Sequence, residues 1–120
     1  MKAENVIREK SYAFALRIVK AYKYLAEEKK EYVLSKQLLR CGTSVGANVE
    51  EAIGGQTPKD FLSKSNVSYQ EARETMYWLR LLKDSDILNE KESDSLMKNC
   101  DELLKIIGTI IKTMKVKLST

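Results

Sequence analysis

Hydrophobic residues recur three and four positions apart in four segments of the chain, which is the spacing of one face of an α-helix. The first segment is the most regular. Its inward positions are Ile7, Ser11, Phe14, Ile18, Ala21 and Leu25. The pattern predicts four helices, over about residues 4–26, 33–54, 58–83 and 90–118.

The other three segments carry comparable rows of inward positions. The second row is Leu34, Leu38, Cys41, Val45, Asn48, Val49 and Ala52. The third row is Leu62, Ser65, Tyr69, Ala72, Met76 and Leu79. The fourth row is Leu96, Cys100, Leu103, Ile107, Ile110 and Met114. Since short polar connections make neighbouring helices reverse direction, we expect one all-α domain over residues 1–120, an antiparallel up-down four-helix bundle.

Two of the helix starts carry local signals. Thr57 can cap a helix whose first position is Pro58, and Asp60 suits the positive end of the helix dipole. Asn89 can cap the fourth helix in the same way, with Glu90 in its first turn. The glycines at 54 and 55 mark the end of the second helix.

Composition argues against ordinary catalysis. The 120 residues contain no histidine, which removes imidazole acid–base chemistry and histidine metal ligands. The two cysteines fall on core positions and are expected to be reduced packing residues. A cluster of four glutamates resembles the ligands of a two-metal site in a helical bundle, but such sites also use histidine ligands, which this chain lacks. Its members are Glu50, Glu51, Glu71 and Glu74. We therefore expect no enzyme activity, no metal and no cofactor.

Two helices carry more apolar surface than one bundle uses. Tyr12, Leu16 and Val19 lie well away from the inward row of the first helix. A second set projects from the third helix: Val67, Trp78 and Leu81. An aromatic residue with aliphatic neighbours is typical of protein interfaces, so these six residues predict a homo-oligomer. The alternative is a wide core stripe that covers them inside one subunit.

The second helix contains a segment of small and polar residues. Gly42 and Gly46, one turn apart, form a shallow groove into which another helix backbone can pack closely. Polar residues border the apolar rows of the second and third helices, and we expect them to form a structural seam. The seam residues are Ser44, Asn48, Glu51 and Arg73. If Glu51 is buried, it needs a partner such as Arg73, because an unpaired buried carboxylate is costly.

The charge distribution suggests an anionic partner. The formal net charge is +4, and residues 103–120 hold four lysines and no acid. Candidate phosphate-binding residues are Lys105, Lys112, Lys115, Arg73 and Arg80. The alternative is a solvated helix face, in which Asp94 pairs with Lys98 and Asp101 with Lys105.

Location is indicated by what the chain does not contain. The longest unbroken apolar run is only the stretch from Tyr12 to Leu16, far below the roughly 20 residues of a membrane-spanning helix. The N-terminal residues are polar and lead to no signal-type apolar stretch. We expect a soluble, cytoplasmic protein with no membrane partner.

Several motifs carry a family resemblance. They are residues 9–15 (EKSYAFA), 40–52 (RCGTSVGANVEEA), 71–75 (EARET) and 77–79 (YWL). Together they resemble the bacterial four-helix-bundle family first noticed in intervening sequences of 23S ribosomal RNA genes. Conservative departures from the commoner residues stand at Cys41, Val45, Val49 and Met76.

The resemblance implies a ring-like homopentamer without catalytic residues. A related accessory protein of diversity-generating retroelements resembles a basic ring that binds nucleic acid and a reverse transcriptase. Our leading hypothesis is therefore a non-enzymatic homo-oligomer that holds RNA or DNA through phosphates, without sequence specificity. The alternative is a protein–protein adaptor whose lysines serve solubility alone.

Overall fold

The computed structural model describes residues 2–119, and these residues form four α-helices and no strand. The helices are α1 (Lys2–Glu27), α2 (Leu34–Ile53), α3 (Pro58–Asp84) and α4 (Glu90–Ser119). Each bound lies within two residues of the bound expected from the sequence. None of the four helices is long and apolar enough to cross a membrane, as far as the described residues go.

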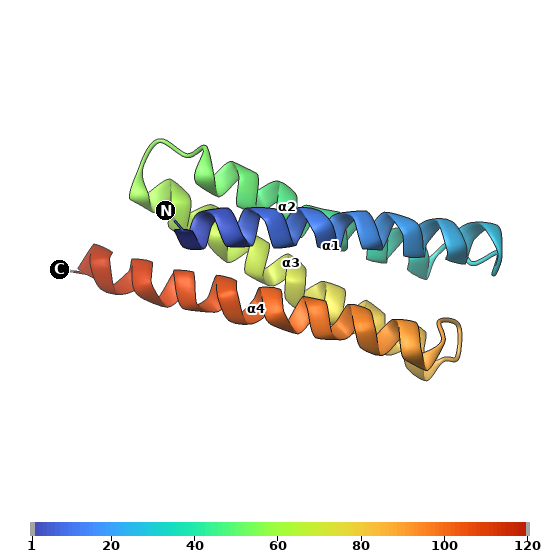
Figure 1. The fold of residues 1–120 in the computed structure, drawn as a ribbon. Helices are drawn as coiled ribbons and strands as arrows, with labels where there is room; N and C mark the ends of the chain where they lie inside the picture. The colour runs from blue at the N-terminus through green and yellow to red at the C-terminus, as the bar shows by residue number, and fades with distance from the viewer. Residues whose placement is uncertain (1, 120) are drawn as a thin grey trace.

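The helices pack along one another in an elongated body that measures 51 × 21 × 20 Å. Each helix lies beside the next one in the chain, and α1 also meets α4. In Figure 1, α1 leads away from the end that holds the N-terminus, and the chain comes back to that end at the C-terminus of α4. The pair α1 and α4 is the least closely packed of the four neighbouring pairs.

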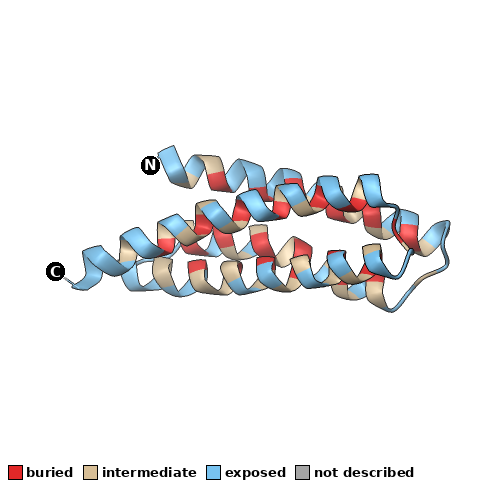
Figure 2. Cartoon of the chain, turned by 90° about the horizontal axis from the view of Figure 1, so that it is seen from below, coloured by how far each residue is buried: buried red, intermediate tan, exposed pale blue. Residues whose placement is uncertain are grey.

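The core lies along the axis between the helices, where Figure 2 shows the buried residues turned toward one another. All six inward residues expected in α1 are buried. In α4 the buried side is centred on Leu96, Cys100, Leu103 and Ile107, as expected, and it continues to Ile111. All four helices contribute residues to a single hydrophobic cluster.

The buried face of α3 agrees with the expected row only in part: Ser65, Ala72 and Leu79 are buried as expected. Leu62, Tyr69 and Met76 are only half-buried. The buried residues of α3 are mostly small: Ser65, Ser68, Ala72, Thr75, Leu79 and Leu82. The face that meets both neighbouring helices is rotated toward Ser68 and Thr75, which the expected row does not include. Small side chains allow closer helix approach, and the Ser68 hydroxyl donates across to the Val45 carbonyl oxygen at 2.8 Å.

Close packing of α1 against α2 depends on the two glycines in the middle of α2. A Cβ atom added to Gly42 would lie 2.8 Å from both γ-carbons of the fully buried Ile18. A Cβ atom added to Gly46 would lie 3.2 Å from the Ser11 backbone oxygen. The expected glycine groove therefore exists, and α1 occupies it.

The two predicted caps are confirmed. The Thr57 hydroxyl accepts from the Asp60 amide, and the Asp60 carboxylate accepts from the Thr57 amide, both at 3.1 Å. This reciprocal pair is a capping box, and Pro58 stands at its expected place. The Asn89 side chain accepts from the Glu92 amide at 2.8 Å at the start of α4.

The start of α2 is capped by a residue that the sequence did not indicate. The N-cap position is Val33, whose side chain cannot accept a hydrogen bond. Instead, the Glu31 carboxylate accepts from the amides of Val33, Leu34 and Ser35 at 3.1, 3.0 and 2.7 Å. Burial alone raises the pKa of the Glu31 carboxyl, but these amide donors hold it below its ordinary value of 4.5.

We expect Glu31→Gln to lower the free energy of unfolding by about 1 kcal/mol at neutral pH, because three amides lose a charged acceptor. A depressed carboxyl pKa stabilises the fold above the unfolded value. That contribution is lost as the pH falls through the folded pKa. Urea unfolding at several pH values measures the difference, which should shrink below about pH 4.5.

The matched control is Glu28→Gln, in the same connection, where the exposed carboxylate caps no helix. It should leave the free energy of unfolding within about 0.5 kcal/mol of the parent. Equal effects of the two substitutions at all pH values would show that the Glu31 cap contributes nothing specific.

Candidate nucleic-acid interface

The outer edge between α3 and α4 is fixed in register by two contacts. The Tyr69 ring rests against Gly108, where an added Cβ would lie 3.4 Å from the ring. Toward the other end, the Lys83 ammonium donates to the Asp94 carboxylate at 2.6 Å. The edge of α3 that faces α4 therefore includes Tyr69 and Lys83, and the facing edge of α4 includes Asp94 and Gly108.

Cationic residues stand on these same edges at helical spacing. Positions 69, 73, 76, 80 and 83 follow one another four and three apart on α3, as do positions 94, 98, 101, 105, 108, 112 and 115 on α4. We call the unpaired cations on the two edges the basic seam. The basic seam consists of Arg73, Arg80, Lys98, Lys112 and Lys115. All five residues are exposed.

The acids next to the basic seam are already engaged. Asp94 binds Lys83 rather than Lys98, which stands one turn further along α4. Asp101 binds Lys105 at 3.0 Å. Within residues 2–119, no ion pair involves a member of the basic seam. Of the two pairs expected for a solvated face, one forms and the other does not, so Lys98 joins the positive surface.

The structure thus separates the five predicted phosphate-binding residues into two kinds. Arg73, Arg80, Lys112 and Lys115 are exposed and unpaired in the described part of the chain. Lys105 lies on the same edge with 78% of its side chain exposed, but it shares its charge with Asp101. An exposed pair of this kind is weak, so Lys105 remains able to exchange partners.

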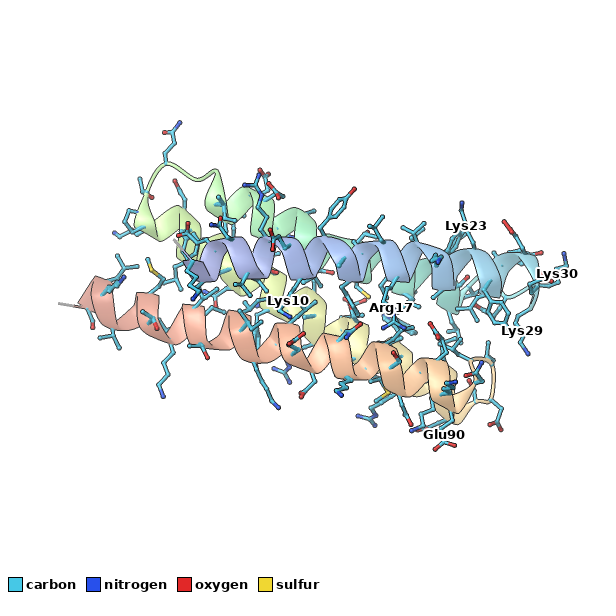
Figure 3. All side chains as sticks on the ribbon, in the orientation of Figure 1. Lys10, Arg17, Lys23, Lys29, Lys30 and Glu90 are labelled. Carbon is cyan, nitrogen blue, oxygen red and sulfur yellow. The ribbon has the colours of Figure 1, made fainter. Side chains whose placement is uncertain are left out.

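On the other edge of α4, where it meets α1, two cations of α1 are engaged by side chains of α4. Arg17 donates to Asn99 at 2.6 Å and to Glu92 at 3.2 Å. Lys10 donates to Glu102 at 3.2 Å. Figure 3 shows Lys10 and Arg17 reaching from α1 toward α4. These bonds join α1 to α4 along the most loosely packed side of the bundle, and Lys10 and Arg17 are paired there.

The predicted interface residues also fall into two groups. Tyr12 and Leu16 are 66% and 53% exposed, one turn apart on α1, with half-buried Val19 beside them. The residues of α3 are half-buried by their own subunit: Val67, Trp78 and Leu81. Trp78 packs partly against the core cluster. The α1 residues therefore form the more exposed apolar surface.

An ionic cluster between α2 and α3 was not foreseen. The Arg40 guanidinium donates to Glu71 at 3.4 Å and, through a second nitrogen, to Glu74. The Glu74 carboxylate also accepts from Trp78 Nε1 at 2.9 Å. Arg40 is more than thirty positions from its partners, so no local pattern could indicate the pairing.

The expected polar seam does not form within the single subunit. Ser44 donates to the Arg40 carbonyl oxygen at 2.7 Å and Asn48 to the Ser44 carbonyl oxygen at 2.9 Å, so both bond within α2. Glu51 and Arg73 are exposed, and no ion pair joins them among the residues described. A carboxylate in water needs no buried partner, which removes the reason for the pairing.

Chemically reactive groups are few. Cys41 and Cys100 are free and buried, and burial raises the pKa of their thiols to about 11 and about 12. Neither thiol is a nucleophile near neutral pH. Glu50 is bound by Arg8 at 2.6 Å. Residues 2–119 contain no group of three or more potential metal ligands close together.

These features define an all-α helical bundle with a basic outer face. The family model of the 23S rRNA-intervening sequence protein matches residues 3–109. The chain belongs to that family. A crystal structure of a protein of unknown function from the S23 ribosomal protein family, from Bacteroides thetaiotaomicron VPI-5482, is similar at 44% sequence identity and a TM-score of 0.90. The match covers 92% of this chain and 98% of that one. The comparison with curated proteins gives no match.

Proposed function

We propose that this protein is a non-catalytic homo-oligomer that binds nucleic acid through the phosphates, using the basic seam between α3 and α4. The observation that carries the proposal is that none of these five exposed cations forms an ion pair among the described residues. Unpaired cations repeated along one face produce a positive potential, which attracts an anionic ligand.

The spacing of the basic seam suits a phosphate backbone. Arg73 and Arg80 are about two helix turns apart, about 10.5 Å along the helix axis. On α4 the same interval separates Lys98, Lys105 and Lys112 from one another in turn. A stacked strand with the helical rise of double-stranded DNA advances about 3.4 Å per phosphate, so 10.5 Å corresponds to about three steps. A row of this kind contacts the backbone and reads no base edges, which supports binding without sequence specificity.

Assembly is the second part of the proposal. The exposed Tyr12 and Leu16 on α1 are the surface through which copies associate. The basic seam lies on α3 and α4, so this contact does not use the seam residues. Symmetry then repeats the basic seam in every subunit, which strengthens binding to a long strand. A ring of five copies and a cytoplasmic location follow from family resemblance and sequence alone.

The test is a double substitution in the basic seam. We expect Arg73→Gln/Arg80→Gln to weaken binding of a labelled single-stranded RNA of about 20 nucleotides by tenfold or more, measured by fluorescence anisotropy at low salt. The slope of log affinity against log salt should fall by about 1.4, since each neutralised phosphate contributes about 0.7 for a single strand.

The matched control is Lys20→Gln/Lys23→Gln, which removes two exposed cations from α1 instead. It should change the affinity by less than about threefold, through net charge alone. If the control weakens binding as strongly as the seam variant, the seam is not the site. If the unmodified oligomer binds no RNA or DNA at low salt, nucleic-acid binding is excluded, and nuclease-resistant capture of a protein partner would then favour the adaptor alternative.

A further inference from the structure

An exposed tyrosine lies between the two arginines of the basic seam. Tyr77 follows Arg73 by four positions and precedes Arg80 by three, so all three side chains leave the same side of α3. Tyr77 is 55% exposed, a fraction comparable to the 51% of Tyr32. Within the described chain, no hydrogen bond or ion pair of the Tyr77 side chain accounts for its position.

The Tyr77 ring is supported from one side. Its ring centroid lies 5.1 Å from that of Trp78, with an angle of 79° between the planes, which is an edge-to-face contact. Trp78 is in turn held by its hydrogen bond to Glu74, and Glu74 by Arg40. The ionic cluster between α2 and α3 thus braces an aromatic pair whose outer member faces solvent.

We infer that Tyr77 is a stacking platform for an unpaired base, and that the ligand of the basic seam is single-stranded RNA or DNA rather than duplex. This inference rests on the proposed function, because the flanking cations supply the phosphate contacts. Arg73 and Arg80 hold consecutive stretches of backbone on either side of the ring, and the base between them lies on the ring face. The ionic cluster braces the ring, which reduces the ordering that binding requires.

Strand selectivity follows from access to base faces. In a duplex each base is covered above and below by its neighbours, so a tyrosine on a convex helix surface reaches only the backbone. In a single strand every base has a free face, and stacking on an aromatic side chain tolerates any sequence. The affinity for duplex therefore comes from the cations alone, whereas the affinity for a single strand comes from the cations and from stacking on Tyr77.

The test compares Tyr77→Leu with the parent on two labelled probes, a mixed-sequence single-stranded DNA of about 20 nucleotides and the duplex of the same sequence. We expect single-strand affinity to fall at least about fivefold, the effect of losing one stacked base, and duplex affinity to change less than twofold. Tyr77→Phe keeps the ring and should keep single-strand affinity. Tyr32→Leu, which removes a tyrosine of similar exposure in the α1–α2 connection, is the matched control.

The outcomes separate this inference from the proposed function. Loss of single-strand affinity in Tyr77→Leu but not in Tyr77→Phe or Tyr32→Leu supports stacking. Equal affinity of Tyr77→Leu and the parent for both probes overturns the stacking inference, while a response to Arg73→Gln/Arg80→Gln leaves the proposed function standing. Equal loss on both probes assigns Tyr77 a merely structural role and also overturns the inference. Binding of neither probe by the parent overturns both proposals.

Discussion

Replacing Gly42 by leucine is expected to lower the free energy of unfolding by about 3 kcal/mol, the upper part of the usual range for overfilling a packed core. Even a single added carbon would lie 2.8 Å from both γ-carbons of Ile18, which is fully buried and branched at Cβ. A branched side chain has few rotamers into which it can withdraw, so α1 and α2 must move apart. Urea unfolding monitored by circular dichroism measures the loss.

Two further comparisons test whether the contact with Ile18 causes this loss of stability. Ala47→Leu adds similar bulk at an exposed position of α2 and should change the free energy of unfolding by less than about 0.5 kcal/mol. Gly42→Ala should cost less in an Ile18→Ala background, where both clashing γ-carbons are gone, than in the parent. An identical cost in both backgrounds would show that contact with Ile18 does not limit the spacing of α1 and α2.

Leu16→Glu is expected to dissociate the proposed homo-oligomer into monomers of 13.7 kDa at micromolar concentration. Leu16 is already 53% exposed in the single subunit, so a charge there costs the isolated fold little. In a contact between copies the same carboxylate is unpaired and removed from water, which weakens such contacts by at least about 2 kcal/mol each. Light scattering coupled to size exclusion measures the mass.

Ser63→Glu is the control, since it places the same charge at an exposed position of α3 away from Tyr12 and Leu16. It should leave the assembly intact, and both variants should keep the helical content of the parent. A parent protein that is itself monomeric at all concentrations contradicts the proposed assembly. So does an unchanged oligomer in Leu16→Glu.

The fold was predictable because its determinants are local. The four-three spacing of apolar residues, a threonine before a proline, and an asparagine before two acids each act within a few positions, and each formed as expected. Glu31 shows where this fails. It caps α2 from two positions before Val33, an arrangement outside the usual serine, threonine or aspartate signal. Ser68 and Thr75 on the buried face of α3 were not predicted, because serine and threonine carry no apolar signal.

The candidate site was only partly predictable, since its charge balance depends on contacts between helices. The sequence indicated Arg73, Arg80 and Lys112 correctly as exposed cations. It assigned Asp94 to Lys98 by local spacing, whereas Lys83 on α3 lies closer in space and takes the carboxylate. Which lysine remains unpaired is therefore decided by tertiary structure. The bracing of Tyr77 likewise depends on Arg40, a residue of another helix.

The two buried thiols give the molecule a practical property. Because Cys41 and Cys100 are buried and protonated, maleimide reagents near neutral pH will not label them. A Thr109→Cys substitution on the exposed side of α4 then provides one reactive thiol per chain. The native cysteines do not have to be replaced first. Spin labels or dyes attached there measure the spacing between copies in the proposed assembly.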